Sequence, residues 1–167
     1  MSNENAVTEP LELAKTFPSF DTDEQALEAL KQGCRAVADD TEFYEWMGLE
    51  VDCLEPGRAV LRLPFDESVT TPSPPARPSI HGGLVATLVD LAGVIALFAA
   101  EGEMVGMATA DLSVDYHSSV NESVVADAVV VDTGGTLRTA RVSVYPADAD
   151  DPDPVATGRT TIRVGEG

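Results

Sequence analysis

Apolar side chains recur at a helical spacing near the start of the chain. Between residues 21 and 39 they return every three or four positions, behind capping residues and an acidic first turn, which predicts an amphipathic helix. A short helical turn is expected within residues 42–48. Residues 1–20 are polar and show no sustained period, so we expect a mobile N-terminal tail there and a single domain over residues 21–167.

Alternating apolar and polar residues predict about six β-strands. A hairpin is expected over residues 49–64, where Glu-Pro-Gly supplies the turn, and residues 65–79 carry four prolines and are expected to form a loop. Four more strands are expected near residues 104–116, 122–132, 136–146 and 155–164. No helical pattern separates these four, so we expect them to form an antiparallel meander.

Residues 81–99 are almost entirely apolar or small and predict a second, longer helix. At about 100° per residue, large side chains cover one face of this helix and small ones cover the other. The small face contains Gly83, Ala86, Thr87, Asp90, Gly93 and Val94. Asp90 lies in its middle, and a buried carboxylate is costly unless it is hydrogen-bonded. Two interpretations stay open: a structural aspartate tied to backbone groups or a partner helix, and a carboxylate with a chemical role.

The start of this helix favours the chemical role. Its sequence His-Gly-Gly places Gly82 and Gly83 where backbone N–H groups have no helical acceptor, so a polarised oxygen can approach them as in an oxyanion hole. Gly82 and Asp90 are eight positions apart, or about 12 Å along the axis. If they act on one carbonyl group, the aspartate must therefore come from a second copy of the chain, with two helices antiparallel across a two-fold axis.

The whole chain is strongly acidic. It carries 29 acidic and 10 basic residues, for a formal net charge of −19. This charge argues against nucleic acid and anionic membranes as partners. It is typical of proteins from extreme halophiles, where salt screens the self-repulsion.

We expect no membrane span, because the apolar run after His81 is interrupted by Asp90 and ends at Glu101. The N-terminus lacks a secretory pattern, so a cytoplasmic location is expected. Cys34 and Cys53 have no histidines at ligand spacing, so we expect reduced thiols and no metal site.

Two segments resemble a known family. The stretch HGGLVATLVDLAGVIALFA resembles the helix signature of hotdog-fold acyl-CoA thioesterases of the phenylacetate-degradation type, and MATADLSVDYHSSV resembles the strand that follows it. With the order of elements, the resemblance covers roughly residues 45–165. It implies an α+β hotdog fold, in which a curved antiparallel sheet of about six strands wraps a long central helix. The helix over residues 21–39 would be an addition at the N-terminus.

The resemblance also implies roles for individual residues. Asp90 matches the carboxylate that acts as nucleophile or as general base on water, and Gly82 matches the backbone donor to the thioester carbonyl. Thr109 falls where the family often has a Ser or Thr that orients the water or the carboxylate. His81 is expected to shape the helix start, and Gly83 to support it.

The implied partner is an acyl-CoA substrate, with no separate cofactor and no metal. Substrate contacts are expected from His81, Gly83, Thr87 and Arg77, and the CoA phosphates have three candidate partners in Arg77, Arg138 and Arg141. We expect a homodimer or, by pairing of two dimers, a homotetramer. Related enzymes often carry Asn or Gln six residues before the His-Gly-Gly histidine. Pro75 stands there in this chain, so Ser73 or Ser79 would have to supply any second donor.

Two other functions fit a hotdog fold. A hydratase or dehydratase acting on a β-hydroxyacyl thioester needs a different arrangement of His and acid, which His-Gly-Gly followed by Asp90 does not match. A non-catalytic acyl-CoA-binding protein would keep the fold without the reaction, and the proline at position 75 is compatible with this alternative.

Overall fold

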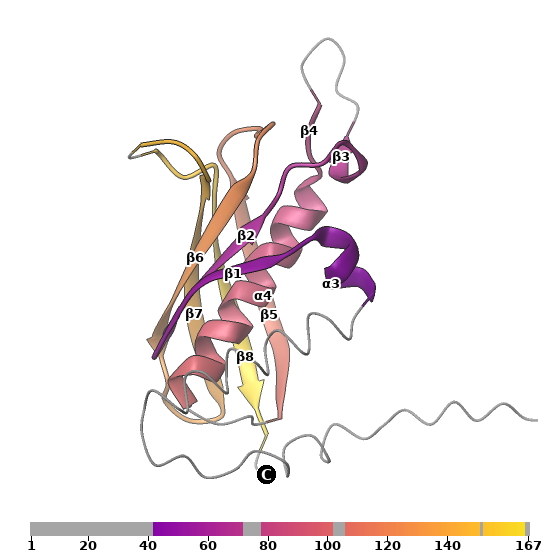
Figure 1. Cartoon of the computed structure of the whole chain (residues 1–167). Coiled ribbons are helices and arrows are strands. Elements are labelled where there is room, and N and C mark those ends of the chain that lie inside the picture. The colour runs from indigo at the N-terminus through magenta and orange to yellow at the C-terminus, as the bar shows by residue number, and fades with distance from the viewer. Residues whose placement is uncertain (1–41, 72–77, 102–105, 151, 166–167) are drawn as a thin grey trace, which may run out of the picture.

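A six-stranded antiparallel sheet curves around one long helix (Figure 1). The computed structural model describes residues 42–71, 78–101, 106–150 and 152–165. The helices are α3 (Glu42–Met47) and α4 (Gly82–Glu101). The sheet strands are β1 (Glu50–Glu55), β2 (Arg58–Leu63), β5 (Met107–Tyr116), β6 (Val124–Asp132), β7 (Leu137–Pro146) and β8 (Ala156–Val164). The predicted α+β hotdog architecture is confirmed, whereas the expected helix over residues 21–39 and the N-terminal tail lie outside the described residues.

The strand order corrects one expectation. The sheet runs β1-β2-β6-β7-β8-β5, so only β6, β7 and β8 form the predicted meander. β5 pairs with β8 at the far edge, and β6 pairs with β2 on one side and β7 on the other, but not with β5, which precedes it in sequence. The seven residues from His117 to Ser123 carry the chain past the start of α4, where the Val120 carbonyl accepts the Ile80 N–H, so β6 enters the sheet away from β5.

The hairpin of β1 and β2 forms as predicted, with a positive φ of 75° at Gly57 in its turn. A register shift between Val51 and Cys53 changes the alternation of β1, so that Leu54 is buried in the core. Cys53 is a free, half-buried thiol, and Cys34 lies outside the described residues.

The proline-rich segment is not entirely a loop. It contains a 3-10 turn, η1 (Glu67–Val69), and a strand β3 (Thr70–Thr71) that pairs with β4 (Ser79–Ile80). Asp66 caps the turn by accepting a hydrogen bond from the Ser68 N–H at 2.8 Å, and the contacts with Ser68 hold the pKa of Asp66 below its ordinary value. Arg77, Pro75 and Ser73 lie outside the described residues.

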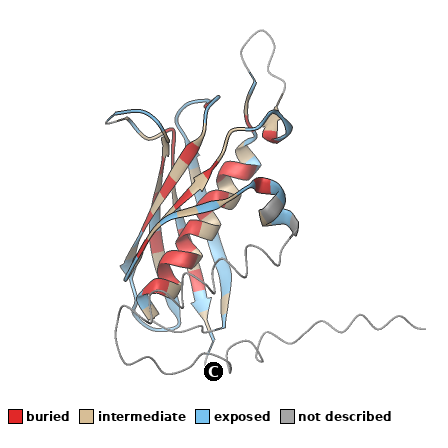
Figure 2. Cartoon of the chain, in the orientation of Figure 1, coloured by how far each residue is buried: buried red, intermediate tan, exposed pale blue. Residues whose placement is uncertain are grey.

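The core lies between α4 and the inner face of the sheet (Figure 2). Two close approaches fix this packing. A Cβ on Gly93 would lie 2.8 Å from the Thr160 Cβ, and a Cβ on Gly158 would lie 2.6 Å from the Val89 Cγ1. Gly93 therefore faces the chain's own sheet and not the small, outward face on which it was predicted. The other residues of that face were predicted correctly to lie away from the core. Gly83 is exposed, and the rest are half-buried: Ala86, Thr87, Asp90 and Val94.

By length and apolar composition α4 is able to cross a membrane, contrary to the expectation that the apolar run falls short. More than half of the apolar stretch is buried inside the protein, and α4 packs against β2, β6, β7 and β8. Its apolar character is therefore that required of a core helix.

Candidate active site

Asp90 lies on the outward side of α4 and is held by the edge strand. The Thr109 hydroxyl on β5 donates a hydrogen bond to the Asp90 Oδ1 at 2.9 Å. Asp90 is half-buried, and Thr109 is exposed. The bond leaves the second carboxylate oxygen, Oδ2, with no partner among the described residues. The predicted pairing of Asp90 with Thr109 is present, and the carboxylate keeps an oxygen for another ligand.

A bulge in β5 determines which of its side chains face the helix. The pairing with β8 shifts register between Thr109 and Asp111. Thr109 points toward α4, whereas Asp111 lies 3.5 Å from Arg159 on the outer face of the sheet. On an unbroken strand, Asp111 and Asp115 would be expected to share a face with Thr109. This expectation is wrong, because a bulge inserts an extra residue and reverses the alternation after it.

The same bulge brings Tyr116 onto the helix side. Thr109 and Tyr116 are seven positions apart, so on a regular strand they would point to opposite faces. Beyond the bulge, the Tyr116 hydroxyl reaches α4 and donates to the Gly82 carbonyl oxygen at 2.7 Å. Tyr116 was missed in the sequence, since an unbroken alternation puts it on the outer face.

The N–H groups at the start of α4 are almost all paired. The N–H groups of Leu84 and Val85 donate to the His81 carbonyl, at 2.9 and 3.3 Å. The Gly83 N–H donates to the His81 Nδ1 at 2.9 Å, so His81 caps the helix, as predicted. The Gly82 N–H has no acceptor among the described residues. Two glycine N–H groups were expected to be free to bind a ligand, and among the described residues only that of Gly82 has no acceptor.

A cavity of about 300 Å³ opens beside this helix start. Its buried lining is apolar and consists of Ile80, Val85, Val120, Val155 and Ala156. Its rim is polar or small and consists of Gly82, Tyr116, His117, Ser118 and Ser119. Asp90 is not among the lining residues. Within one chain, the structure therefore joins Gly82 to Tyr116 and Asp90 to Thr109, but it does not bring the two pairs to one point.

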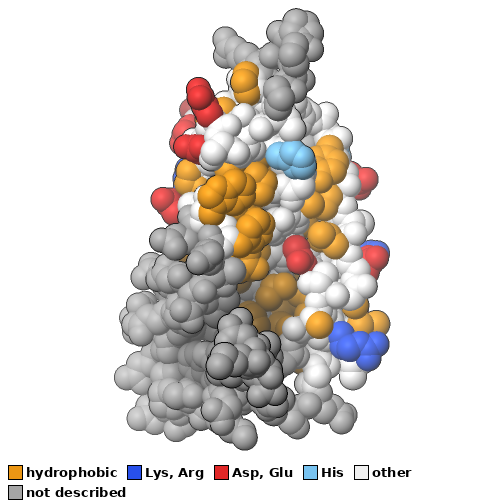
Figure 3. All heavy atoms as spheres, turned by 90° about the vertical axis from the view of Figure 1, so that its right-hand side faces the viewer, with side chains coloured by type: hydrophobic (Ala, Val, Ile, Leu, Met, Phe, Trp, Pro, Cys, Tyr) orange, Lys and Arg blue, Asp and Glu red, His pale blue; other side chains and the backbone are white. Residues whose placement is uncertain are grey.

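Hydrophobic side chains gather on the face that carries α3 and lie near an exposed histidine (Figure 3). Phe43 and Trp46 are the exposed hydrophobic residues of α3, with their rings stacked at a centroid distance of 6.1 Å. This part of the molecule thus offers apolar surface close to the helix that bears Gly82 and Asp90.

Three predicted substrate contacts fall elsewhere or are already used. The Thr87 hydroxyl donates to the Gly83 carbonyl at 3.0 Å, so it is engaged within its own helix. Arg138 forms an ion pair with Glu101 at the opposite end of α4 from Gly82. Arg141 is exposed and lines grooves on the outer face of the sheet, away from α4. Arg138 and Arg141 are therefore poor candidates for CoA phosphates at this site.

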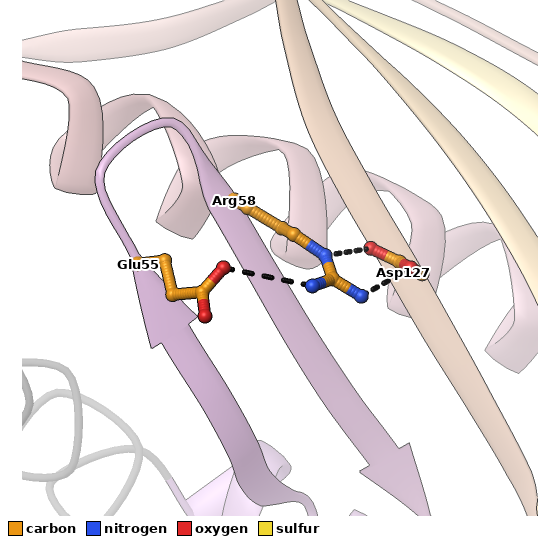
Figure 4. A network of polar contacts seen from close by, with 3 residues as sticks. All are labelled: Glu55, Arg58 and Asp127. Carbon is orange, nitrogen blue, oxygen red and sulfur yellow. Dashed lines mark hydrogen bonds and ion pairs between the residues drawn. The ribbon is translucent and has the colours of Figure 1, made fainter.

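Other arginines bind carboxylates across the strands. Arg58 on β2 donates to both carboxylate oxygens of Asp127 on β6, at 2.9 and 2.8 Å (Figure 4). It also forms an ion pair with Glu55, in which Nη1 lies 3.5 Å from Oε2. The hydrogen bond to Asp127 and its charge raise the pKa of Arg58. Pairs this exposed contribute at most about 1 kcal/mol, so they stabilise the sheet modestly and take no part in the site. Among the residues that the structure describes, no group of three His, Cys, Asp or Glu side chains is arranged to hold a metal ion.

Comparison with known proteins assigns the family. Residues 78–152 match the profile of the thioesterase superfamily. A Halobacterium salinarum protein named "Putative esterase" is 38% identical over 150 residues, which cover 87% of this chain and 95% of the relative. The chain belongs to the thioesterase superfamily. The protein is accordingly a thioester hydrolase in general terms.

Solved structures of this superfamily share its architecture. Zebra fish thioesterase superfamily member 2 is 28% identical, with a TM-score of 0.70, and the match covers 83% of this thioesterase and 98% of that chain. The Escherichia coli PaaI protein of the phenylacetic acid degradation operon has a TM-score of 0.69 at 16% identity, covering 85% and 97% of the two chains. The second similarity extends to the fold alone.

Proposed function

We propose that this thioesterase hydrolyses acyl-CoA to CoA and a carboxylate, at sites shared between two copies of the chain. The observation that carries this proposal is the Gly82 N–H. It is the backbone donor at the start of a 20-residue helix that finds no acceptor among the described residues. The helix dipole adds positive potential there, so a thioester oxygen that gains negative charge is stabilised.

The edge strand supports a dimer. β5 is ten residues long, lies at the end of the sheet, and is exposed along most of its length. Such an edge presents unpaired N–H and C=O groups that a second copy is able to bind. Antiparallel pairing about a two-fold axis places the Tyr116 end of one strand beside the Thr109 end of the other. Because Tyr116 holds Gly82 and Thr109 holds Asp90, this pairing brings Gly82 of one chain toward Asp90 of its partner.

The chemistry then follows from the two groups. A water oxygen attacks the thioester carbon while the Asp90 carboxylate accepts its proton, and the carbonyl oxygen becomes an oxyanion bound by the Gly82 N–H. When the tetrahedral intermediate collapses, the C–S bond breaks and the proton passes to the CoA thiolate. Direct attack by Asp90 would give an anhydride that water then hydrolyses, with the same products. Thr109 orients the carboxylate in both cases.

The remaining expectations belong to this proposal. The acidic sequence supports a halophilic source. A cytoplasmic location and the lack of any cofactor beyond the CoA of the substrate stay predictions. The pairing of two dimers into a tetramer and a substrate contact by Arg77 stay predictions.

Two substitutions test the reaction directly. Gly82→Pro deletes the N–H at the first helical position, where proline is well tolerated, whereas Gly82→Ala keeps the N–H. A Cβ at Gly82 would meet the Tyr116 ring at an ordinary 3.4 Å. We expect Gly82→Pro to lower kcat by about 10²- to 10³-fold and Gly82→Ala to retain most activity, measured as thiol release from a panel of acyl-CoAs in high salt.

Asp90→Asn should reduce kcat by at least about 100-fold, because the base is lost. Asp148→Asn, in the exposed connection from β7 to β8, is the matched control and should be unaffected. Near-native thiol release by Asp90→Asn on every substrate would disprove the mechanism. Tight acyl-CoA binding without thiol release by the unmodified protein would favour the binding protein instead.

A further inference from the structure

One peptide group at the start of α4 is held by side chains from two directions. The peptide between Gly82 and Gly83 presents its carbonyl to the Tyr116 hydroxyl, at 2.7 Å, and its N–H to the His81 Nδ1, at 2.9 Å. Both flanking residues are glycines, which leave a peptide free to adopt many orientations. The two hydrogen bonds together restrict this peptide to one orientation.

Packing around the glycines supports the same conclusion. A Cβ built on Gly82 would contact the Tyr116 ring atoms at 3.4 to 3.6 Å, so the ring lies flush against this glycine. A Cβ on Gly83 would lie 3.0 Å from the His81 Nδ1, tighter than almost all real contacts. The two side chains thus touch the helix start on separate residues: a Cβ at Gly82 would be in ordinary contact, whereas one at Gly83 would be crowded.

The arrangement also determines which donor stays available. Because the His81 Nδ1 accepts the Gly83 N–H, this ring nitrogen carries no hydrogen. The Gly83 N–H is therefore occupied, and the neighbouring Gly82 N–H is left for a ligand. The Gly82 N–H belongs to the preceding peptide, whose His81 carbonyl is held by the Leu84 and Val85 N–H groups. Anchoring the Gly82 carbonyl as well holds the backbone on both sides of the Gly82 Cα and so limits the motion of that N–H.

We propose that Tyr116 is a positioning residue, which aims the Gly82 N–H at the reacting carbonyl by holding the next peptide of the helix. This inference rests on the proposed function. Tyr116 does not touch the reacting atoms in this role; it acts through Gly82. Its position on β5 means that the strand proposed to pair with the partner subunit also sets the geometry of the donor.

The test is Tyr116→Phe, which removes the hydroxyl and keeps the ring against Gly82. The ring is 54% exposed, so the core does not depend on it. A misaligned donor weakens binding of the transition state more than of the substrate, so we expect kcat to fall about tenfold with KM changed less than about twofold. Tyr145→Phe is the matched control, because Tyr145 lies on the outer face and its hydroxyl bonds to no described residue. It should leave both constants unchanged.

A second measurement separates positioning from substrate contact. Tyr116 also lines the cavity beside Gly82, and a residue that only binds substrate would raise KM with kcat unchanged. That result, or a kcat equal to that of Tyr145→Phe, would overturn the inference, whereas the proposed function would stand if Asp90→Asn and Gly82→Pro still lower kcat by about 100-fold or more. If the unmodified enzyme releases no thiol, the proposed function fails first. Amide hydrogen exchange at Gly83, whose N–H is hydrogen-bonded within the same peptide, then tests whether the Tyr116 hydroxyl holds that peptide. Faster exchange is expected in Tyr116→Phe, and unchanged exchange would contradict the inference.

Discussion

His81 shows how much of this site depends on single hydrogen bonds. Its carbonyl accepts two N–H groups of the first turn, its ring accepts a third, and its own N–H donates to the Val69 carbonyl. The sequence predicted the capping role of His81 and the chemical roles of Gly82 and Asp90. It did not predict that the Gly83 N–H is hydrogen-bonded to the His81 ring, because that bond depends on the rotamer of the His81 side chain.

Removing this cap should cost stability. His81→Ala leaves the Gly83 N–H without its acceptor, and we expect the free energy of unfolding to fall by about 1 kcal/mol. His81→Asn keeps a side-chain acceptor suited to a helix start and should recover most of the loss. Urea denaturation in constant high salt measures both values. Equal stability of the Ala variant and the unmodified protein would show that the bond to Gly83 contributes nothing.

At the scale of elements, the fit between α4 and the sheet depends on small residues at contact points. Gly93 lets the helix approach β8, where the buried Thr160 hydroxyl donates to the Val89 carbonyl at 3.3 Å. The helix and all six strands were predicted, since each has a strong local period. The order of the strands, the bulge in β5 and the short β3–β4 pair were not, because pairing partners and bulges depend on residues far apart in sequence.

Gly93→Ala tests this close approach. The added Cβ would lie 2.8 Å from the Thr160 Cβ, so the helix or strand must shift. Overpacking costs about 1–3 kcal/mol, partly offset by the gain of about 1 kcal/mol in helix propensity. We therefore expect a net loss of stability and a lower Tm. Gly106→Ala, with no atom within 4 Å of the new Cβ, is the control and should change Tm little. An unchanged Tm in Gly93→Ala would show that the helix has room to move.

At the scale of the whole molecule, the proposed site depends on assembly. Gly82 and Asp90 cannot reach one carbonyl from the same helix, so the proposed reaction requires two chains. The net charge of −19 opposes such association at low salt, whereas salt screens the repulsion.

Mixed dimers test the shared site. The Gly82→Pro and Asp90→Asn chains, co-expressed with different affinity tags and purified through both, form dimers in which one of the two sites has both native groups. We expect these mixed dimers to recover about half of the unmodified activity, although each parent is slowed by about 100-fold or more. A site contained within one chain would show no recovery, because neither chain carries both groups.

The sequence alone predicted the long helix, the strands and the thioesterase superfamily, and it singled out Asp90, Gly82 and Thr109 as candidate site residues, because local periodicity and a short motif encode them. Only the tertiary structure decided that a bulge turns both Thr109 and Tyr116 toward α4, that the Gly82 N–H is the donor left at the helix start, and that Arg138 and Arg141 lie elsewhere. The physical reason is that these outcomes depend on which distant segments pair and in which register, and no local pattern records that.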